Sequence, residues 1–227
     1  MPTPPPHWFE RDPLALAPLL LGGVLRRADA SGGVAVRLTE VEAYRGSDDP
    51  GAHTFRGKTA RNATMFGPGG RVYCYFTYGM HHAVNIVAGP EGSGWGVLVR
   101  AGEVVEGHEL ALERRSARRA TRPSGELARG PGNVAQALGA TLADDGAALG
   151  DATELGDGVT AADGVSTVTW SFEGAEVLPP QRTGPRVGVS GPGGDASAYP
   201  WRFWIPGEPS VSAYRAALPR GRSRSLQ

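Results

Sequence analysis

The chain has 227 residues, of which 40% are apolar and 20% charged, and its formal net charge is zero. This length suits one domain with a sizeable core, and no run approaches the roughly 18 consecutive apolar residues of a membrane span. The start, MPTPPPHWFERDPLA, lacks a basic head followed by an apolar run, so we expect no signal peptide and a cytoplasmic protein. The lone Cys74 lies on an apolar stretch, which is typical of a small buried hydrophobe.

Charged residues are segregated along the chain. Arginines gather between residues 114 and 129, and the final segment PRGRSRSLQ adds three more. Acids dominate residues 142–179, which contain no lysine or arginine. Zero net charge argues against an overall basic footprint for nucleic acid. The segregation nevertheless allows a locally positive face, although it fits ordinary solvated surface equally well.

The first half of the chain predicts one helix followed by four strands. Residues 11–23 predict the helix, with Asp12 as its N-cap and Pro13 in its first turn. Apolar and polar residues alternate over 32–44, which predicts a strand, and the period slips near Glu40, where we expect a bend or bulge. Three further strands are predicted over residues 71–79, 82–89 and 94–102.

The second half mixes helices and strands without a repeating βαβ unit. Helices are predicted over 105–119 and 130–141, and late strands are predicted over residues 164–172, 185–191 and 201–207. Residues 142–165 are rich in Ala, Gly and Asp with little to bury, and predict an acidic, loop-rich insertion. This order predicts an α+β fold: a single domain with a curved, mostly antiparallel β-sheet, flanking helices and a protruding β-hairpin.

The stretch TEVEAYRGSDDPGAH contains the first candidate functional residues. It places Glu42 near the end of a strand, two residues before Tyr44, with His53 in the following loop. A carboxylate that is partly desolvated there gains proton affinity and can act as a general base. Taken singly, Glu42 is more typical of a surface strand and Tyr44 of packing. Loops carry a large share of functional side chains, which favours His53.

A second stretch, VYCYFTYGMHHAVN, adds an aromatic cluster. Tyr73 and Tyr75 are two apart and share one strand face, whereas Tyr78 stands where the strand must turn. An aromatic at a hairpin tip either packs on the protein's own core or inserts between bases. On the returning strand Asn85 can test a base edge, and Arg100 at the end of the next strand needs an anion or acceptor.

These motifs resemble, in order and spacing, those of the alkyladenine (3-methyladenine) DNA glycosylases. The resemblance rests on TEVEAYRGSDDPGAH, ARNATMFGPGGRVYCYFTYGMHHAVNI, GVLVRAGEVVEG and LARGPGNVAQALG, and it covers nearly the whole chain. It implies a monomeric, monofunctional purine DNA N-glycosylase that binds double-stranded DNA, flips out an alkylated or deaminated purine and hydrolyses its N-glycosidic bond. No cofactor is implied, and the enzyme is expected to associate with the nucleoid when it is bound to DNA.

Position by position, the resemblance implies catalytic roles for Glu42, as the base that activates a water for attack on the sugar, and for Arg100, which holds that water. It implies that Tyr44 and Tyr75 sandwich the flipped base, with His53 contacting the base or its sugar-phosphate. Stacking on electron-rich rings suits a cationic methylated purine, which supports these positions independently.

The resemblance also implies contacts with the duplex and a check on the base. Tyr78 and Met80 are expected to bind DNA, with Tyr78 filling the gap that the flipped base leaves. Asn85 is expected to disfavour guanine by crowding its exocyclic amine. A flexible lead-in over 1–8, one glycosylase domain over 9–218 and a basic disordered tail over 219–227 complete the expected organisation.

Two other functions remain open from the residues. A nucleic-acid-binding module without turnover would use the same aromatics as a stacking platform, although a pocket carboxylate would repel phosphate. A metal-dependent hydrolase would draw its ligands from His53, Glu40 and the adjacent His81 and His82. Neighbouring residues on a strand point to opposite faces, so the two histidines suit one ion poorly, and we expect no metal.

Overall fold

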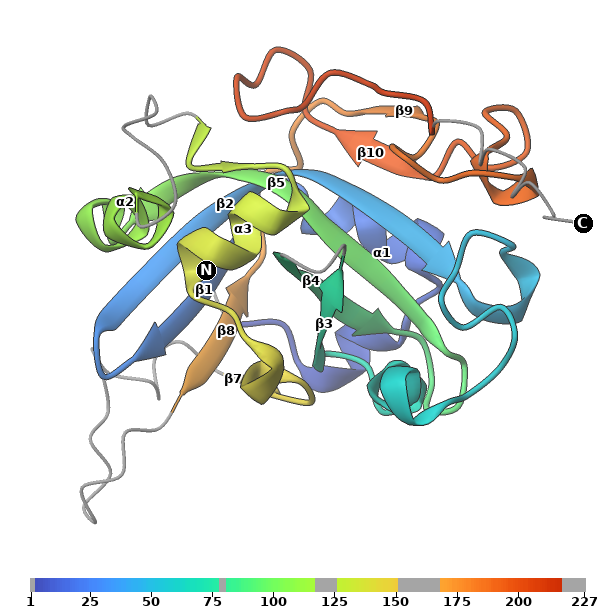
Figure 1. Ribbon diagram of the computed structural model, residues 1–227, viewed down its shortest axis with the longest axis horizontal. Helices are drawn as coiled ribbons and strands as arrows, with labels where there is room; N and C mark the ends of the chain where they lie inside the picture. Colours follow the sequence, from blue (N-terminus) through green and yellow to red (C-terminus); the bar gives the residue numbers. More distant parts are fainter. Residues whose placement is uncertain (1–2, 78–80, 117–125, 151–167, 218–227) are drawn as a thin grey trace, which may run out of the picture.

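One long strand, β2 (Gly32–Arg45), organises the fold because it pairs with three neighbours, β1, β5 and β10. The computed structural model describes residues 3–77, 81–116, 126–150 and 168–217. Within these residues ten strands form one curled sheet, ordered β3-β4-β5-β2-β1-β8-β7 along its main path (Figure 1). β10 continues from β2 to β9, and β6 pairs with β5.

In the first half of the chain four strands overlap the four predicted segments, whereas β1 was not predicted. The other strands are β1 (Val24–Asp29), β3 (Val72–Thr77), β4 (His81–Ala88), β5 (Trp95–Glu106), β6 (Ala128–Arg129), β7 (Leu149–Gly150), β8 (Thr169–Glu173), β9 (Arg182–Gly184) and β10 (Arg202–Trp204). Every described ladder is antiparallel except the one between β7 and β8. The predicted α+β domain with a curved, mostly antiparallel sheet is therefore confirmed.

Helices cover the sheet from both sides. α1 (Pro13–Leu20) begins at the predicted N-cap, where the Asp12 side chain accepts a hydrogen bond from the Leu14 amide at 2.8 Å. It lies behind β2 and β5 in Figure 1, whereas α3 (Pro131–Leu138) crosses in front of them. α3 ends where Gly139 adopts a left-handed conformation, with φ at 72°. The apolar core lies between these helices and the sheet.

A short helix, α2 (His108–Ser116), starts later than predicted. β5 continues to Glu106, and Gly107 then turns the chain with φ at 70°. The strand therefore includes Val105 and Glu106, which the predicted helix had contained. Residues 117–119 of the predicted helix lie outside the described part of the chain.

The expected bulge near Glu40 is confirmed. The register pairs Leu38 with Gly102, Glu40 with Ala101 and Val41 with Val99, so it passes over Thr39 on β2 and Arg100 on β5. A bulge bends its strand and re-aims side chains. Here it turns Arg100 toward the acids of β2, with which Arg100 makes ion pairs.

The predicted strand over 185–191 is wrong. The residues form turns, and the nearby strand β9 (Arg182–Gly184) ends before them. Arg186 within this segment is buried and bonds to Asp49 at 2.5 and 2.7 Å, which fixes the backbone outside any ladder. The late strand predicted over 164–172 is present as β8 from Thr169, and its earlier part falls on residues that are not described.

Two expectations of irregular structure also need correction. Residues Pro6–Glu10 form a 3-10 helix, and the Trp8 ring packs 5.9 Å from that of Phe172, so the expected lead-in is already anchored by residue 8. The segment 142–165 was expected to bury little, yet Asp144 near its start is buried. Asp144 accepts hydrogen bonds from Arg27 Nε at 2.8 Å and Trp170 Nε1 at 2.9 Å.

Three further expectations can be compared with the structure. β3 and β4 pair in antiparallel register, but the predicted protruding tip falls on residues 78–80, outside the described part. Cys74 is buried as predicted, and desolvation raises the pKa of its thiol to about 12. No helix in the described part of the chain is long and apolar enough to cross a membrane.

Asp144→Ala is expected to lower the free energy of unfolding by about 3–5 kcal/mol, because removing one partner of a buried ion pair leaves the Arg27 charge under-compensated. Urea denaturation followed by circular dichroism measures the change. Glu91→Ala, at an exposed acid, is the control and should stay within about 0.5 kcal/mol of wild type. A loss at Asp144 as small as that at Glu91 would contradict the role of this ion pair.

Candidate active site

A cavity of about 410 Å³ opens between the sheet and two loops. This volume falls in the range of about 300–1,000 Å³ that is typical of small-molecule sites. The wall comes from β2, β3, β4 and β5, from the loop after β2, from the start of α3, and from the segment that follows β9. Its lining includes Glu42, Tyr44, His53, Tyr73, Tyr75, Asn85, Arg100 and Val187.

Glu42 is the acid of this cavity, and its side chain is completely buried. The Tyr44 hydroxyl donates a hydrogen bond to Oε2 at 2.8 Å, and the Val187 amide donates one to Oε1 at 2.7 Å. Arg100 Nε lies 3.5 Å from Oε1. Each carboxylate oxygen therefore has a donor in place, and a cation stands beside them.

Burial and hydrogen bonding act on the pKa of Glu42 in opposite directions. Desolvation raises the pKa and outweighs the lowering by Arg100, Val187 and Tyr44. Burial, followed by the neighbouring charge of Glu42, also raises the pKa of Tyr44 well above its usual value. Tyr44 thus stays protonated as a donor, while Glu42 has an increased affinity for a proton.

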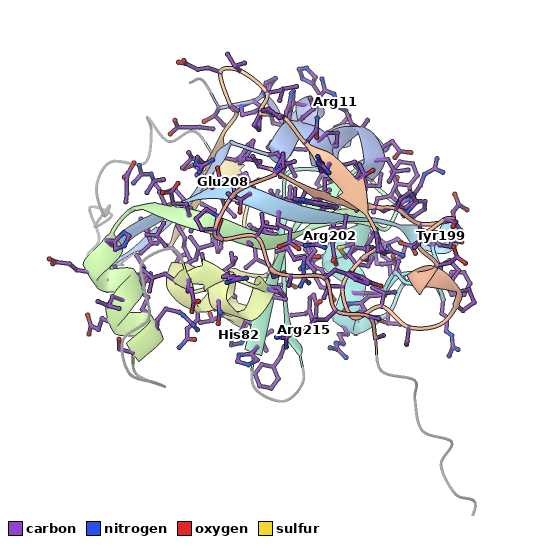
Figure 2. The ribbon with its side chains drawn as sticks, turned by 90° about the horizontal axis from the view of Figure 1, so that it is seen from above. Arg11, His82, Tyr199, Arg202, Glu208 and Arg215 are labelled. Carbon is purple, nitrogen blue, oxygen red and sulfur yellow. The ribbon has the colours of Figure 1, made fainter. Side chains whose placement is uncertain are left out.

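The second acid of β2, Glu40, is equally buried but has a different environment. Its Oε1 accepts hydrogen bonds from Arg100 Nε at 2.7 Å and Arg202 Nε at 2.6 Å, and its Oε2 accepts from the Ser212 amide at 3.1 Å. Arg202 is buried, and its label lies near the middle of the view in Figure 2. Because two arginines compensate it, Glu40 is a structural hub that anchors β5, β10 and the chain near Ser212.

The charge of Arg100 is secured by these two acids. Burial opposes the charged form, but Glu42 and Glu40 outweigh it and raise the pKa of Arg100. Its Nη2 also lies 3.4 Å from Ser212 Oγ. The Arg100 guanidinium therefore contacts both Glu40 and Glu42.

Aromatic rings form one wall of the cavity. The rings of Tyr73 and Tyr75 are stacked with centroids 5.3 Å apart, as expected for residues that share a strand face. His53 meets Tyr75 edge-on at 4.6 Å. Desolvation, and then the positive charge of Arg61, lowers the pKa of His53. His53 is consequently favoured in its neutral form at the rim of the cavity.

The amide of Asn85 is held in a fixed position. It lies opposite Tyr73 in the β3–β4 ladder, and its Nδ2 donates to the Tyr73 carbonyl at 3.2 Å. The Tyr73 hydroxyl, by contrast, is buried without a hydrogen-bond partner among the described residues. Desolvation raises the pKa of Tyr73 to about 12.

Six of the predicted site residues line the one cavity. They are Glu42, Tyr44, His53, Tyr75, Asn85 and Arg100. The other two, Tyr78 and Met80, lie outside the described residues. Sequence reasoning missed Val187 and its neighbour Arg186. The available signal was an arginine inside the apolar run PRVGVSG, which pointed to a specific buried partner.

The sequence also left open a metal-dependent hydrolase and a nucleic-acid-binding module. Among residues that the structure describes, no group of three or more His, Cys, Asp or Glu is arranged to hold a metal ion. Glu40, one of the ligands considered, is occupied by arginines. Within the basic run, Arg114 donates to the Leu138 carbonyl at 2.9 Å and pairs with Asp29, so it is tied to the protein itself.

Comparisons with known proteins identify the family of this chain. The sequence model of the family described as Methylpurine-DNA glycosylase (MPG) matches residues 7–209. A protein of Streptomyces avermitilis is 50% identical over 95% of this chain and 93% of its own. One of Leifsonia xyli subsp. xyli is 49% identical over 91% and 90%, and one of Cutibacterium acnes is 45% identical over 89% and 95%. All three are named "Putative 3-methyladenine DNA glycosylase".

The family match and the names of these relatives place the chain in a class of DNA repair enzymes. The chain belongs to the methylpurine-DNA glycosylase family. It is accordingly a monofunctional DNA glycosylase whose substrate is DNA, and the resemblance found in the sequence is confirmed.

Two of the three cavity tyrosines, Tyr44 and Tyr73, should respond differently to loss of their hydroxyls. Tyr73→Phe is expected to leave the stability unchanged or raise it, because a buried hydroxyl without a partner is removed. Tyr44→Phe is expected to cost about 1–3 kcal/mol, because Glu42 loses a donor. Urea denaturation of both variants measures the difference. Equal losses would contradict the distinct environments of the two hydroxyls.

Proposed function

We propose that the protein flips alkylated purines, and deaminated ones, out of double-stranded DNA into this cavity and hydrolyses the N-glycosidic bond to leave an abasic site. One observation carries the proposal: a fully buried carboxylate, Glu42, lies in an aromatic cavity beside Arg100. Flipping a base out of the duplex costs a few kcal/mol and costs least for a damaged, poorly paired base. Damaged bases are therefore selected already at the flipping step, before they contact the cavity.

Glu42 acts as the general base in this proposal. It takes a proton from a water whose oxygen forms a bond to C1′ as the bond from C1′ to the purine nitrogen breaks. The departing purine keeps the bonding electrons, which an alkylated, cationic purine accepts readily, so the sugar passes through an oxocarbenium-like state. The raised pKa of Glu42 strengthens it as a base. Excision should therefore decline as the pH falls through that raised pKa.

Arg100 holds the attacking water and keeps Glu42 charged. Its bond to Glu40 at 2.7 Å fixes the guanidinium, and its 3.5 Å separation from Glu42 Oε1 supports the carboxylate form. Without this cation, desolvation would drive Glu42 toward its protonated form, which cannot act as a base.

The flipped base stacks on the tyrosines. Tyr44 and Tyr75 both line the cavity, and the edge-on contact of His53 fixes the Tyr75 ring. Electron-rich rings attract a cationic purine more strongly than a neutral one. Asn85, held by the Tyr73 carbonyl, excludes guanine by crowding its exocyclic amine.

Duplex contacts complete the proposal. Tyr78 and Met80 follow β3 and bind the DNA, with Tyr78 inserted into the gap in the duplex. The enzyme works as a monomer in the cytoplasm, on the nucleoid. Because phosphate contacts supply most non-specific affinity, a chain with zero net charge should bind moderately and with strong salt dependence.

A binding module without turnover was another possibility that the sequence left open, and membership of the glycosylase family argues against it. Such a module has no use for a buried acid, and a carboxylate opposes the approach of phosphate. Incubation with a duplex that carries one hypoxanthine or one 3-methyladenine, in EDTA, separates the two. Alkali-labile sites support the glycosylase, whereas stable binding without base loss supports the module.

Glu42→Gln should lower single-turnover excision on the order of 10²–10⁴-fold while lesion binding persists. Excision of hypoxanthine, the poorer leaving group, should be slowed more than excision of 3-methyladenine.

The Glu42→Gln variant should be at least as stable as wild type at neutral pH. Because the folded pKa of Glu42 is raised, its stabilising contribution is present at low pH and is lost as the pH rises through that pKa.

Glu91→Gln, at an exposed acid, is the matched control for this variant and should excise at the wild-type rate. Excision of hypoxanthine by Glu42→Gln at the wild-type rate would remove Glu42 from the mechanism.

Asn85→Ser should relax discrimination against guanine, because the smaller side chain no longer crowds the exocyclic amine. Activity on adenine-derived lesions should be retained. Competition between duplexes with normal guanine and with hypoxanthine measures the ratio of excision rates. An unchanged ratio would count against the guarding role.

A further inference from the structure

Arg186 is a buried cation that the proposed chemistry does not use. It is 1% exposed, and it forms a two-bond ion pair with Asp49, from Nη1 at 2.5 Å and Nη2 at 2.7 Å. Nη1 also donates to the Ala43 carbonyl at 3.0 Å, and Nη2 to the Gly193 carbonyl at 2.8 Å. One guanidinium thus connects β2, the loop after it and two turns near the C-terminus.

Aromatic rings surround the same guanidinium. Its central carbon lies 4.5 Å from the ring centroid of Tyr44, 5.3 Å from that of Trp201 and 5.6 Å from that of Tyr199. Tyr199 is at the edge of the molecule in Figure 2, so the cluster runs from the surface to the cavity wall. A desolvated cation over aromatic faces gains more than an exposed one.

The backbone around Arg186 is shaped for its side chain. A Cβ atom added at Gly51 would lie 2.5 Å from Nη2, closer than any side chain tolerates. Glycine at position 51 therefore lets the loop close over the guanidinium. Such a fitted site fixes the position of the backbone on either side of Arg186.

Both hydrogen bonds to Glu42 come from groups that Arg186 holds. Val187, the next residue, donates its amide to Oε1, and Tyr44, whose ring Arg186 covers, donates its hydroxyl to Oε2. Loss of the guanidinium would free the chain at Val187 and uncover one face of Tyr44.

We propose that Arg186 and Asp49 are a positioning pair for Glu42, which fixes the two donors that orient its carboxylate. The inference rests on the proposed role of Glu42 as the base. A buried ion pair is by itself weak support for stability, so a pair this elaborate beside the cavity needs another reason. Neither residue touches substrate in this account, and both act through Val187 and Tyr44.

The charged and titratable groups around Glu42 determine its pKa, and the pH dependence of excision reports that pKa. They are Glu40 and Tyr44 on β2, Arg100 on β5, Arg202 on β10 and Arg186 itself. The donors Val187 and Tyr44 lower the pKa of Glu42 against the effect of burial. Loss of the Arg186–Asp49 pair, which restrains these donors, should raise the pKa of Glu42 further. The acidic limb of the plot of excision rate against pH should then move to higher pH.

The test compares Arg186→Lys and Asp49→Asn with Arg27→Lys. Arg27 is also buried and paired, with Asp144 and Asp29, but it does not line the cavity. Single-turnover excision of hypoxanthine is measured from pH 5 to 9 at saturating protein, so that binding and the fraction of folded protein are separated from the rate. Asp49→Asn keeps the size of the side chain in case Arg186→Lys folds poorly.

Both cavity-side variants should lose about 10²-fold in maximal rate, as misplacement of a catalytic group does. The midpoint of their acidic limb should move to higher pH, while Arg27→Lys keeps the wild-type midpoint even if it is less stable. An unchanged midpoint in Arg186→Lys and Asp49→Asn, with Glu42→Gln inactive, would overturn the positioning role alone. Wild-type excision by Glu42→Gln would overturn the proposed function and this inference together.

Discussion

The desolvation of a single carboxylate is the constraint on which the rest of the site depends. Glu42 is withdrawn from water, and a bare buried carboxylate is costly unless donors and a cation compensate it. Those partners come from segments far apart in the chain: Tyr44 from the same strand, Arg100 from β5 and Val187 from the turn after β9. Folding of the sheet and docking of the C-terminal segment are therefore both required before the acid has its environment.

Glu40 and Glu42 lie on the same strand but have different roles, because their surroundings differ. Glu40 is compensated by Arg100 and Arg202 and holds the structure together. Glu42 is bonded by Tyr44 and Val187, its ion-pair contact with Arg100 is longer than that of Glu40, and its pKa is raised. The double register shift at Glu40 brings this about, since it turns Arg100 toward both carboxylates instead of leaving it in the regular ladder. Division of labour between neighbouring carboxylates is a general way to obtain base chemistry near neutral pH.

Local pattern explains why some features were predictable from the sequence and others were not. The long strand, its bulge and the two tyrosines on one face follow from side-chain period. The family resemblance, not the period, brought Glu42, Tyr75 and Asn85 into one site. Val187 could not be predicted, because its role depends on where a distant turn docks. The run around Arg186 alternates like a strand, but the buried pair with Asp49 overrides that pattern. Asp144 was misjudged for the same reason, since its partner Arg27 is 117 residues away.

Direct titration of Glu42 tests the central claim. Carboxyl ¹³C resonances of glutamate, followed by NMR across the pH range and assigned by comparison with Glu42→Gln, report the pKa of this one group in the free protein. The structure predicts a titration clearly above the ordinary range of a glutamate, because desolvation outweighs the hydrogen bonds and Arg100. A Glu42 that titrates within or below that range would contradict the account of a carboxylate activated by burial.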